Sequence, residues 1–525
     1  MRPLRCAVLG AVVALAATAC GSSNPDGPAQ GAVTITIDSG PIHGAVDGEV
    51  RSFLGIPYAA PPVGALRFLP PKPVAPWTAA REAVGYGSPC TQIAMGAVAS
   101  GTSEDCLYLN VWLPAREVTK AKVLGWIHGG GFTGGSGSDP MYGGSRIAEK
   151  YGVIVVTMNY RLGALGFLSH SSLAKAEGVT VAPSAALLDQ QAALAWVHRN
   201  IAAFGGDPNA VMLAGESAGA MSVCAQLVMG GPQDHFASAA MESGTCAALS
   251  AIWVKPAAAE DMASRLATKV GCPTDDGALA CLQQKSAEEI MLALPGRKVS
   301  IGPGDLFGPV VDGVTLPKVP ITALRAGERR KVPVVLGSNL NEGQIFGRQW
   351  GEAAPTGEEL RAIVKDVIGA STKVEEVAAR YGFDGDGRAA LVKMLDDVFP
   401  CSARQAARAL AETGPPAYLY RFVYPYSIPA LVGVVTSHAF EIPFLFRTGF
   451  VGANLNDEQL PMADVFDGYW LSFPSGDPNA TRLTGTVAWP KYTKDADELL
   501  VLDLPPRTEK GTKSTECDYF DSLVP

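Results

Sequence analysis

The chain has 525 residues, of which 47% are hydrophobic and 18% are charged, and it carries a formal net charge of −9 at pH 7. A chain of this length and composition can bury a large core, and the negative charge argues against a nucleic-acid partner, which needs a basic face. The sequence shows no long internal linker or repeat, so residues 33–525 are predicted to form a single domain.

Residues 1–19 have the three parts of a secretory signal peptide: a positive start, a short apolar core and the small residues Ala-Thr-Ala. Cys20 follows directly. Ala-Thr-Ala-Cys resembles a bacterial lipobox, which places a lipid on the cysteine, although Leu is more usual than Ala17. An ordinary signal peptidase could cut at the same point. We therefore expect an exported protein, either a cell-envelope lipoprotein or a secreted one, with membrane attachment only through a lipid on Cys20.

The segment 20–32 is predicted to be a flexible tether, because it is polar and rich in Gly, Ser and Pro. Beyond it, Asp47-Gly48 between two extended runs indicates a β-hairpin. Apolar runs typical of buried strands occupy residues 123–127, 153–158, 210–214, 331–336 and 417–424. Helical patterns cover residues 185–204, 218–228 and most of 357–413.

This alternation of strands and helices predicts an α/β fold, with a mostly parallel central sheet and helices on both faces. In such sheets the ligand site lies beyond the carboxyl ends of the strands. The segment Gly215-Glu216-Ser217-Ala218-Gly219 falls there, between a predicted strand and a predicted helix, and it is the only Gly-x-Ser-x-Gly in the chain. A serine in such a turn has an exposed hydroxyl, which makes Ser217 the candidate nucleophile.

A serine hydroxyl needs an adjacent base to act as a nucleophile at neutral pH. In this type of fold the chain order is serine, acid, histidine. The sequence has six histidines, and those that follow Ser217 are His235 and His438. His235 comes too soon to leave room for an acid and further strands, so elimination selects His438 as the base.

Spacing alone leaves the acid open. Glu342 follows the predicted strand at 331–336 on a loop, as the chemistry requires, but Asp305 and Asp312 compete with it. Each of the three could equally be a solvated loop charge.

Acyl transfer also needs hydrogen-bond donors for the developing oxyanion. His128-Gly129-Gly130-Gly131-Phe132 follows the predicted strand at 123–127, and successive glycines let backbone N–H groups turn toward one point. Together with the amide of Ala218, they can form an oxyanion hole.

Several further motifs accompany these residues. They are FLGIPYA at 53–59, SEDCLYLN at 103–110, NYRLG at 159–163, GFL at 166–168, LDQ at 188–190, PVVDG at 309–313, NEG at 341–343 and HAFEIPF at 438–444. With them, the chain from about residue 33 onward resembles the type-B carboxylesterases and lipases of the α/β-hydrolase fold. That family also contains the cholinesterases and the catalytically inactive neuroligins.

The resemblance implies a serine carboxylic ester hydrolase that works through an acyl-enzyme, with a small-molecule ester as substrate and no cofactor or metal. It implies the following roles: Ser217 as nucleophile, Glu342 as acid, His438 as base, and Gly130, Gly131 and Ala218 as donors of the oxyanion hole. Asp312 then becomes a structural turn residue.

The resemblance also implies structural links. Two ion pairs are expected, Arg67 with Glu104 and Arg161 with Asp189. An even number of cysteines remains after Cys6 and Cys20, and in an exported chain this suggests disulfides. The family suggests Cys90 with Cys106, Cys272 with Cys281 and Cys401 with Cys517, which leaves Cys224 with Cys246 by subtraction.

The loop between Cys90 and Cys106 is short and contains no tryptophan. In cholinesterases a longer loop carries the aromatic ring that holds the choline cation, so choline esters are not expected as substrates. Two alternatives remain beside the esterase. One is a lipase, or a hydrolase of another acyl bond such as an amide or carbamate. The other is a surface binding protein that retains the triad without using it.

Overall fold

The computed structural model describes residues 32–523, with short gaps at 232–234, 295–296, 298, 370–371 and 451–453. The predicted signal peptide, Cys20 and nearly all of the predicted tether lie outside the described residues.

Thirteen strands of the described chain form one sheet. Their bounds are β1 (Ala32–Ile37), β2 (Gly40–Asp47), β3 (Val50–Pro57), β4 (Arg81–Glu82), β7 (Tyr108–Pro114), β8 (Ala121–Ile127), β9 (Ile154–Met158), β10 (Gly206–Glu216), β11 (Ser238–Glu242), β12 (Val334–Asn339), β13 (Ala417–Phe422), β14 (Glu498–Leu502) and β15 (Arg507–Lys510). The strand order is β1-β2-β3-β7-β9-β8-β10-β11-β12-β13-β14-β15, and β4 pairs with β2. A separate small hairpin joins β5 (Ile93–Ala94) and β6 (Ala97–Val98).

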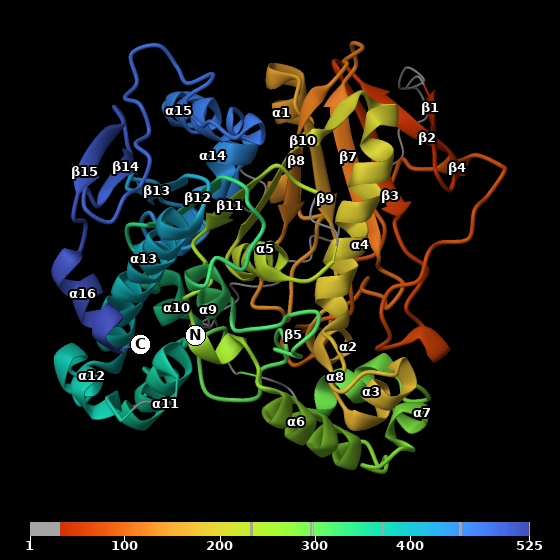
Figure 1. The fold of residues 1–525 in the computed structure, drawn as a ribbon, viewed down its shortest axis with the longest axis horizontal. Helices are drawn as coiled ribbons and strands as arrows, with labels where there is room; N and C mark the ends of the chain where they lie inside the picture. Colours follow the sequence, from red (N-terminus) through yellow and green to blue (C-terminus); the bar gives the residue numbers. More distant parts are fainter. Residues whose placement is uncertain are drawn as a thin grey trace, which may run out of the picture.

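In this order the strands from β9 to β14 run parallel. The strands toward both edges pair antiparallel, except for β4, which is parallel to β2. Helices cover both faces (Figure 1). Their bounds are α1 (Ser145–Tyr151), α2 (Gly163–Phe167), α3 (Ser171–Glu177), α4 (Ala185–Asn200), α5 (Ala218–Val228), α6 (Pro256–Lys269), α7 (Ala278–Leu282), α8 (Ala287–Ala293), α9 (Pro320–Arg325), α10 (Gly343–Gln349), α11 (Gly357–Ile368), α12 (Val374–Tyr381), α13 (Gly387–Thr413), α14 (Ile442–Phe446), α15 (Leu460–Trp470) and α16 (Ser514–Leu523). The predicted fold class is confirmed.

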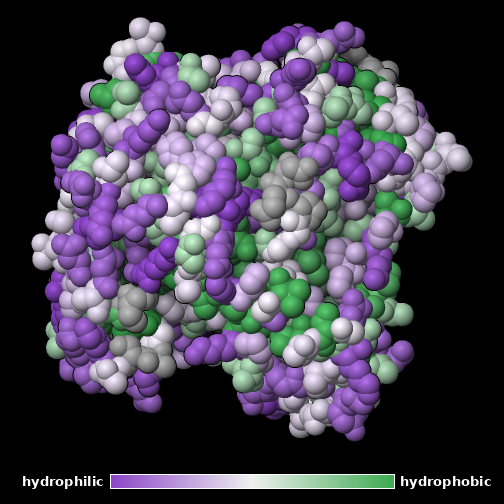
Figure 2. Space-filling model, in the orientation of Figure 1, coloured by the Kyte–Doolittle hydropathy of each residue, from purple (hydrophilic) through white to green (hydrophobic). Residues whose placement is uncertain are grey.

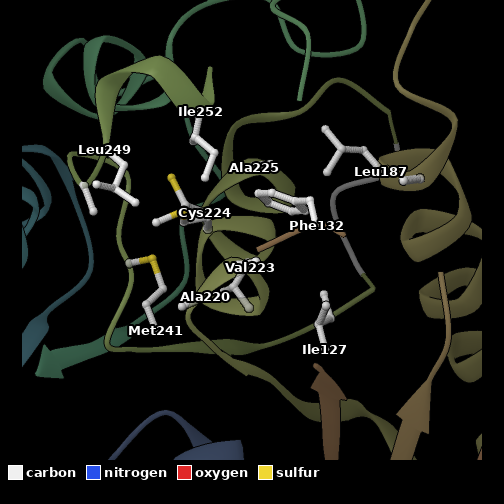
Figure 3. Packing of buried hydrophobic residues seen from close by; sticks show 14 of the residues in the cluster. Ile127, Phe132, Leu187, Ala220, Val223, Cys224, Ala225, Met241, Leu249 and Ile252 are labelled. Atoms are coloured by element: carbon white, nitrogen blue, oxygen red, sulfur yellow. The ribbon is translucent and has the colours of Figure 1, made fainter. Parts of the chain in front are cut away.

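Successive side chains of β10 enter two different cores, as expected for a strand buried on both faces. Val211 and Leu213 belong to a hydrophobic cluster that includes residues of α4, α5 and α13, whereas Met212 and Ala214 belong to a cluster that includes residues of α1, α14 and α15. Helix α5 is buried along its whole length, and the cluster around it includes Ile127 from β8 and Met241 from β11 (Figure 3). The turn between β10 and α5 is therefore held from both of its ends.

The predicted elements agree with the structure in type and differ at their ends. Helix α5 has the predicted bounds, and the helix predicted over 185–204 is α4 followed by a 3-10 turn that ends at Gly205, where φ is 86°. The strand predicted at 210–214 is too short, because β10 extends through the polar residues 206–209 to pair with β8. The strand predicted at 331–336 begins too early, since β12 starts at Val334 and continues to Asn339.

The four expected disulfides are all formed. They join Cys90 with Cys106, Cys224 with Cys246, Cys272 with Cys281 and Cys401 with Cys517. The last of these ties α13 to α16. Beside it, the Lys513 ammonium donates to the Asp396 carbonyl at 2.8 Å and to the Asp397 carboxylate at 2.6 Å.

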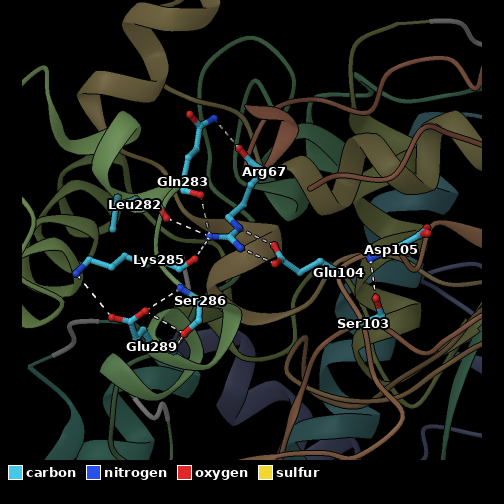
Figure 4. Close-up of polar contacts among 9 residues, drawn as sticks. All are labelled: Arg67, Ser103, Glu104, Asp105, Leu282, Gln283, Lys285, Ser286 and Glu289. Carbon is cyan, nitrogen blue, oxygen red and sulfur yellow. Dashed lines mark hydrogen bonds and ion pairs between the residues drawn. The ribbon is translucent and has the colours of Figure 1, made fainter. Parts of the chain in front are cut away.

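Both expected ion pairs are present. The Arg67 guanidinium binds both oxygens of Glu104, and it also donates to the carbonyls of Leu282 and Lys285 (Figure 4). The Arg161 guanidinium binds both oxygens of Asp189 at 2.7 and 2.8 Å, and the Asp189 side chain is completely buried.

Hydrophilic residues cover most of the molecular face drawn in Figure 2, and hydrophobic residues gather below its centre, over β5. Met95, in the turn between β5 and β6, is 86% exposed. A search of the described residues for a helix of sufficient length and apolarity to span a membrane finds none.

We predict that Asp189→Asn lowers the free energy of unfolding by about 3–5 kcal/mol, because it leaves the buried Arg161 cation without its counter-ion. The comparison is Asp305→Asn, which removes a half-buried partner of the exposed Arg265 and should cost at most about 1 kcal/mol. Urea denaturation of both variants measures the two values. Equal losses of unfolding free energy in the two variants would show that burial does not determine how much the Arg161–Asp189 pair contributes to stability.

Candidate active site

Ser217 lies at the corner between β10 and α5, with φ 56° and ψ −122°. This is a strained conformation for a residue with a side chain, and the turn is maintained by a hydrogen bond from the Ser217 amide to the Glu242 carbonyl at 2.9 Å. A Cβ atom added at Gly219 would lie 2.0 Å from the Ile127 carbonyl oxygen, so the corner admits no side chain there. Ser217 itself remains partly exposed.

Glu342 lies three residues beyond the end of β12, and its side chain is completely buried. One carboxylate oxygen, Oε1, accepts from the Asn339 amide at 2.6 Å and from the Ser243 hydroxyl at 2.7 Å. The other, Oε2, lies 2.7 Å from Nδ1 of His438. The carboxylate is therefore fixed from three directions.

The two other acids that spacing allowed lie in different surroundings. Asp312 accepts hydrogen bonds from the amides of Val314 and Leu316, which is the geometry of a turn residue. Asp305 forms an ion pair with Arg265. Of the three candidates, Glu342 is the one in contact with His438.

His438 lies between β13 and α14, on a loop that is joined to the loop of Glu342. The Asn341 amide donates to the Thr436 carbonyl at 3.1 Å, and the Asn339 side chain donates to the Ser437 carbonyl at 2.7 Å. These bonds bring together two side chains that are 96 residues apart in the sequence. The rings of Phe346 and Phe399 lie 4.8 and 5.0 Å from the imidazole ring.

Because Nδ1 of His438 donates to Glu342, Nε2 is the free acceptor of the neutral ring. Nε2 lies 3.0 Å from Oε1 of Glu216, the residue immediately before Ser217. The imidazole thus reaches the corner that carries Ser217.

The glycine loop lies against the same corner. A Cβ atom added at Gly129 would be 3.2 Å from Cβ of Ser217. Gly130 and Gly131 have φ values of 108° and 63°, which favour glycine, and Gly130 is exposed. Ala218, the first residue of α5, directly follows Ser217.

His128 fixes the orientation of this loop. Its Nδ1 donates to the Gly129 carbonyl at 2.8 Å, and its ring stacks on Tyr160 at 4.4 Å. Burial lowers the pKa of His128 to about 4, so the ring is neutral at ordinary pH. In a trans peptide the C=O and N–H groups point in opposite directions, so the bond to Gly129 turns the Gly130 N–H away from His128.

Three buried acids surround the site, and they were not identified from the sequence. They are Glu216, Glu242 and Glu441. Burial raises the pKa of all three, and that of Glu441 rises to about 8; the negative charge of Glu342 adds to the effect at Glu216 and Glu441. Glu216 and Glu441 lie within the motifs around Ser217 and His438, which was the signal that could have found them.

Two hydrogen bonds hold these acids in place. The Trp470 indole donates to Glu242 at 2.7 Å, and the Asn339 side chain donates to Glu441. In the part of the chain that the structure describes, no group of three or more His, Cys, Asp or Glu side chains could hold a metal ion.

The comparisons with known proteins identify a family. A model of the carboxylesterase family matches residues 31–520. The para-nitrobenzyl esterase of Bacillus subtilis (strain 168) is 34% identical over 483 residues, which cover 89% of this chain and 94% of that protein. The cholinesterase of Mus musculus is 34% identical over an alignment that covers 94% of this chain and 87% of that protein.

The solved structures lead to the same family. A PNB esterase matches with a TM-score of 0.80 and 32% identity, covering 93% of this chain and 99% of that one. A carboxylesterase of Geobacillus stearothermophilus at pH 6.2 matches with a TM-score of 0.77 and 34% identity, again covering 93% and 99%. The chain therefore belongs to the carboxylesterase family, and it is a serine carboxylic ester hydrolase with the α/β-hydrolase fold.

Proposed function

We propose that Ser217, His438 and Glu342 form the catalytic triad of this hydrolase. The observation that carries the proposal is the 2.7 Å contact between the Glu342 carboxylate and Nδ1 of His438, with Nε2 directed to the corner of Ser217. In the first step Nε2 takes the hydroxyl proton as the Ser217 oxygen attacks the ester carbonyl carbon. The C–O bond of the ester then breaks, and His438 returns that proton to the departing alcohol.

Water completes the cycle. His438 removes a proton from a water molecule as the water oxygen attacks the acyl carbon. The proton then passes to the Ser217 oxygen when the carboxylic acid product leaves. Each attack places negative charge on the carbonyl oxygen. The amides of Gly130, Gly131 and Ala218 are the donors that we assign to it, because the glycine loop and the start of α5 meet at Ser217.

We propose small-molecule carboxylic esters as the substrate class. The relatives include a para-nitrobenzyl esterase and a fumonisin B1 esterase of Sphingopyxis macrogoltabida, which is 34% identical over 477 residues. Because both relatives are esterases, p-nitrophenyl and p-nitrobenzyl esters are suitable first probes.

We predict that Ser217→Ala lowers the turnover of a p-nitrophenyl ester by about 10⁴-fold or more, because no other group can form the acyl-enzyme. The variant should also lose labelling by a fluorophosphonate. Ser171→Ala, which changes an exposed serine at the start of α3, is the control and should behave like the wild type. Substantial turnover by folded Ser217→Ala would refute the assignment.

The buried acids give the fold a specific pH dependence. An unfolded glutamate has a pKa of about 4.3, whereas the pKa of Glu441 in the folded protein is about 8. Between these values the folded protein retains a proton that the unfolded chain has released. The contribution of Glu441 to stability is therefore complete at low pH and decreases as the pH rises from about 4.3 toward 8.

We predict that Glu441→Gln removes this decrease in stability with rising pH, because glutamine does not titrate and its side-chain oxygen can still accept the hydrogen bond from Asn339. The melting temperature of the variant, relative to that of the wild type, should increase steadily between pH 5 and pH 8. The control is Glu412→Gln, an exposed position, for which the difference should not depend on pH. A pH-independent difference for Glu441→Gln as well would contradict the proton retention.

We also propose that the protein is exported and anchored through a lipid on Cys20. The support is the sequence of residues 1–20, in which an apolar core and Ala-Thr-Ala precede the cysteine. We assign no nucleic-acid partner, because the net charge is −9.

In a bacterial host, the wild-type protein should therefore be found in the membrane fraction, and Cys20→Ser in the soluble fraction outside the cytoplasm. Mass spectrometry of the mature N-terminus checks the lipid directly. If the wild-type protein is soluble and begins with an unmodified Cys20, the lipid anchor is refuted and the protein is secreted instead.

A further inference from the structure

In the loop closed by the Cys90–Cys106 disulfide, the Gln92 side chain binds Gly135, in the segment that follows the glycine loop of the active site. Its Nε2 donates to the Gly135 carbonyl at 3.1 Å, and its Oε1 accepts from the Gly135 amide at 3.0 Å. The amide of Gln92 thus pairs with Gly135 as a neighbouring β-strand would. Nε2 also donates to the Cys90 carbonyl at 3.1 Å, which fixes the side chain to the disulfide itself.

Gly135 is coupled to the proposed oxyanion donors by a tight turn. The Gly130 carbonyl accepts from the amides of Thr133 and Gly134, both at 3.1 Å. A Cβ atom added at Gly130 would lie 2.2 Å from the Gly134 carbonyl oxygen, and one added at Gly135 would lie 2.4 Å from Nδ1 of His128. With so little free space, a displacement of Gly135 is passed to Gly130.

The backbone around Gln92 is itself held in place. The Thr91 amide donates to the Ser103 carbonyl at 3.0 Å across the disulfide loop. The Asn159 side chain donates to the carbonyls of Ser88 and Cys106, both at 3.1 Å, and it accepts from the Gly137 amide at 2.8 Å. The disulfide loop and the segment after the glycine loop therefore share one hydrogen-bonded frame.

We propose that Gln92 is a positioning residue for the oxyanion hole, which it links to the Cys90–Cys106 loop. The inference rests on the proposed role of Gly130 and Gly131. Oxyanion donors work only when they are fixed before the charge develops, because reorientation during the reaction would consume the stabilisation that they provide. Gln92 touches neither the substrate nor Ser217 in this scheme, and it acts through the backbone of Gly135.

The test compares two inhibitors in Gln92→Ala. A trifluoromethyl ketone forms a tetrahedral adduct with an oxyanion and needs the hole, whereas its parent methyl ketone binds mainly as a ground-state analogue. We expect the trifluoromethyl ketone to bind about 10- to 100-fold more weakly, with a parallel fall in kcat, since complete loss of one donor costs about 10²–10³-fold. The affinity of the methyl ketone and KM should change by less than about threefold.

Gln92→Glu provides a second variant that keeps the shape and the acceptor for the Gly135 amide but loses the donor. It should show the same selective loss, and it keeps the test decisive if Gln92→Ala does not fold. The matched control is Gln191→Ala, in which a glutamine that donates to the Gly230 carbonyl far along the chain is removed. It should leave both inhibitors unaffected.

Equal weakening of the two inhibitors in folded variants, or no weakening of either, would overturn the proposal. A failure of the triad assignment has a different signature, because it would abolish fluorophosphonate labelling of Ser217 in the wild-type protein as well.

Discussion

A buried carboxylate loses the water that stabilises its charge, so the site depends on how the surroundings of Glu342 replace that water. Two donors, the Asn339 amide and the Ser243 hydroxyl, hold one oxygen, and the imidazole of His438 holds the other. Three more glutamates lie nearby, but burial raises their pKa values. Among the four buried acids, Glu342 is the one that accepts from both of these donors and lies against Nδ1 of His438.

The side chains of the proposed triad come from three different strand ends, and their mutual positions are set by bonds between loops. The loop of Glu342 is joined to that of His438 by the Asn341 amide and the Asn339 side chain. The Cys224–Cys246 disulfide links α5, which begins directly after Ser217, to the segment that follows β11 and Ser243. The parallel sheet brings the loops to one edge, and these cross-links determine the distances between them.

The fold class and two of the three residues of the proposed triad could be inferred from local patterns. Ser217 lies in a motif with a strand before it and a helix after it, and His438 is selected because few histidines follow Ser217. The acid could not be selected in this way, since Glu342, Asp305 and Asp312 all lie on loops and differ mainly in burial and partners. Resemblance to a family chose Glu342, and it also chose three of the four disulfide pairs.

The buried acids show the limit of reading one sequence. Glu216, Glu242 and Glu441 are separated by up to 225 residues (441 − 216), and their raised pKa values arise from burial that only the folded chain creates.

Strand ends were misplaced for a related reason. Residues 206–209, Gly-Asp-Pro-Asn, resemble a turn, yet β10 begins at Gly206, which pairs with Ala121 of β8 ahead of a register shift. Local composition cannot report such a partner.

The anchoring of α16 has a consequence for the order in which the molecule is made. Asp396 accepts the amide of Gly343, next to Glu342, at 2.7 Å, and Lys513 and the Cys401–Cys517 disulfide hold the same stretch of α13. Residues 513 and 517 leave the ribosome after every other group described around the triad. A nascent chain therefore carries Ser217, Glu342 and His438 before it contains the groups that hold α13 behind Gly343. The support that α16 gives to this part of α13 is thus the last part of the described site to be synthesised.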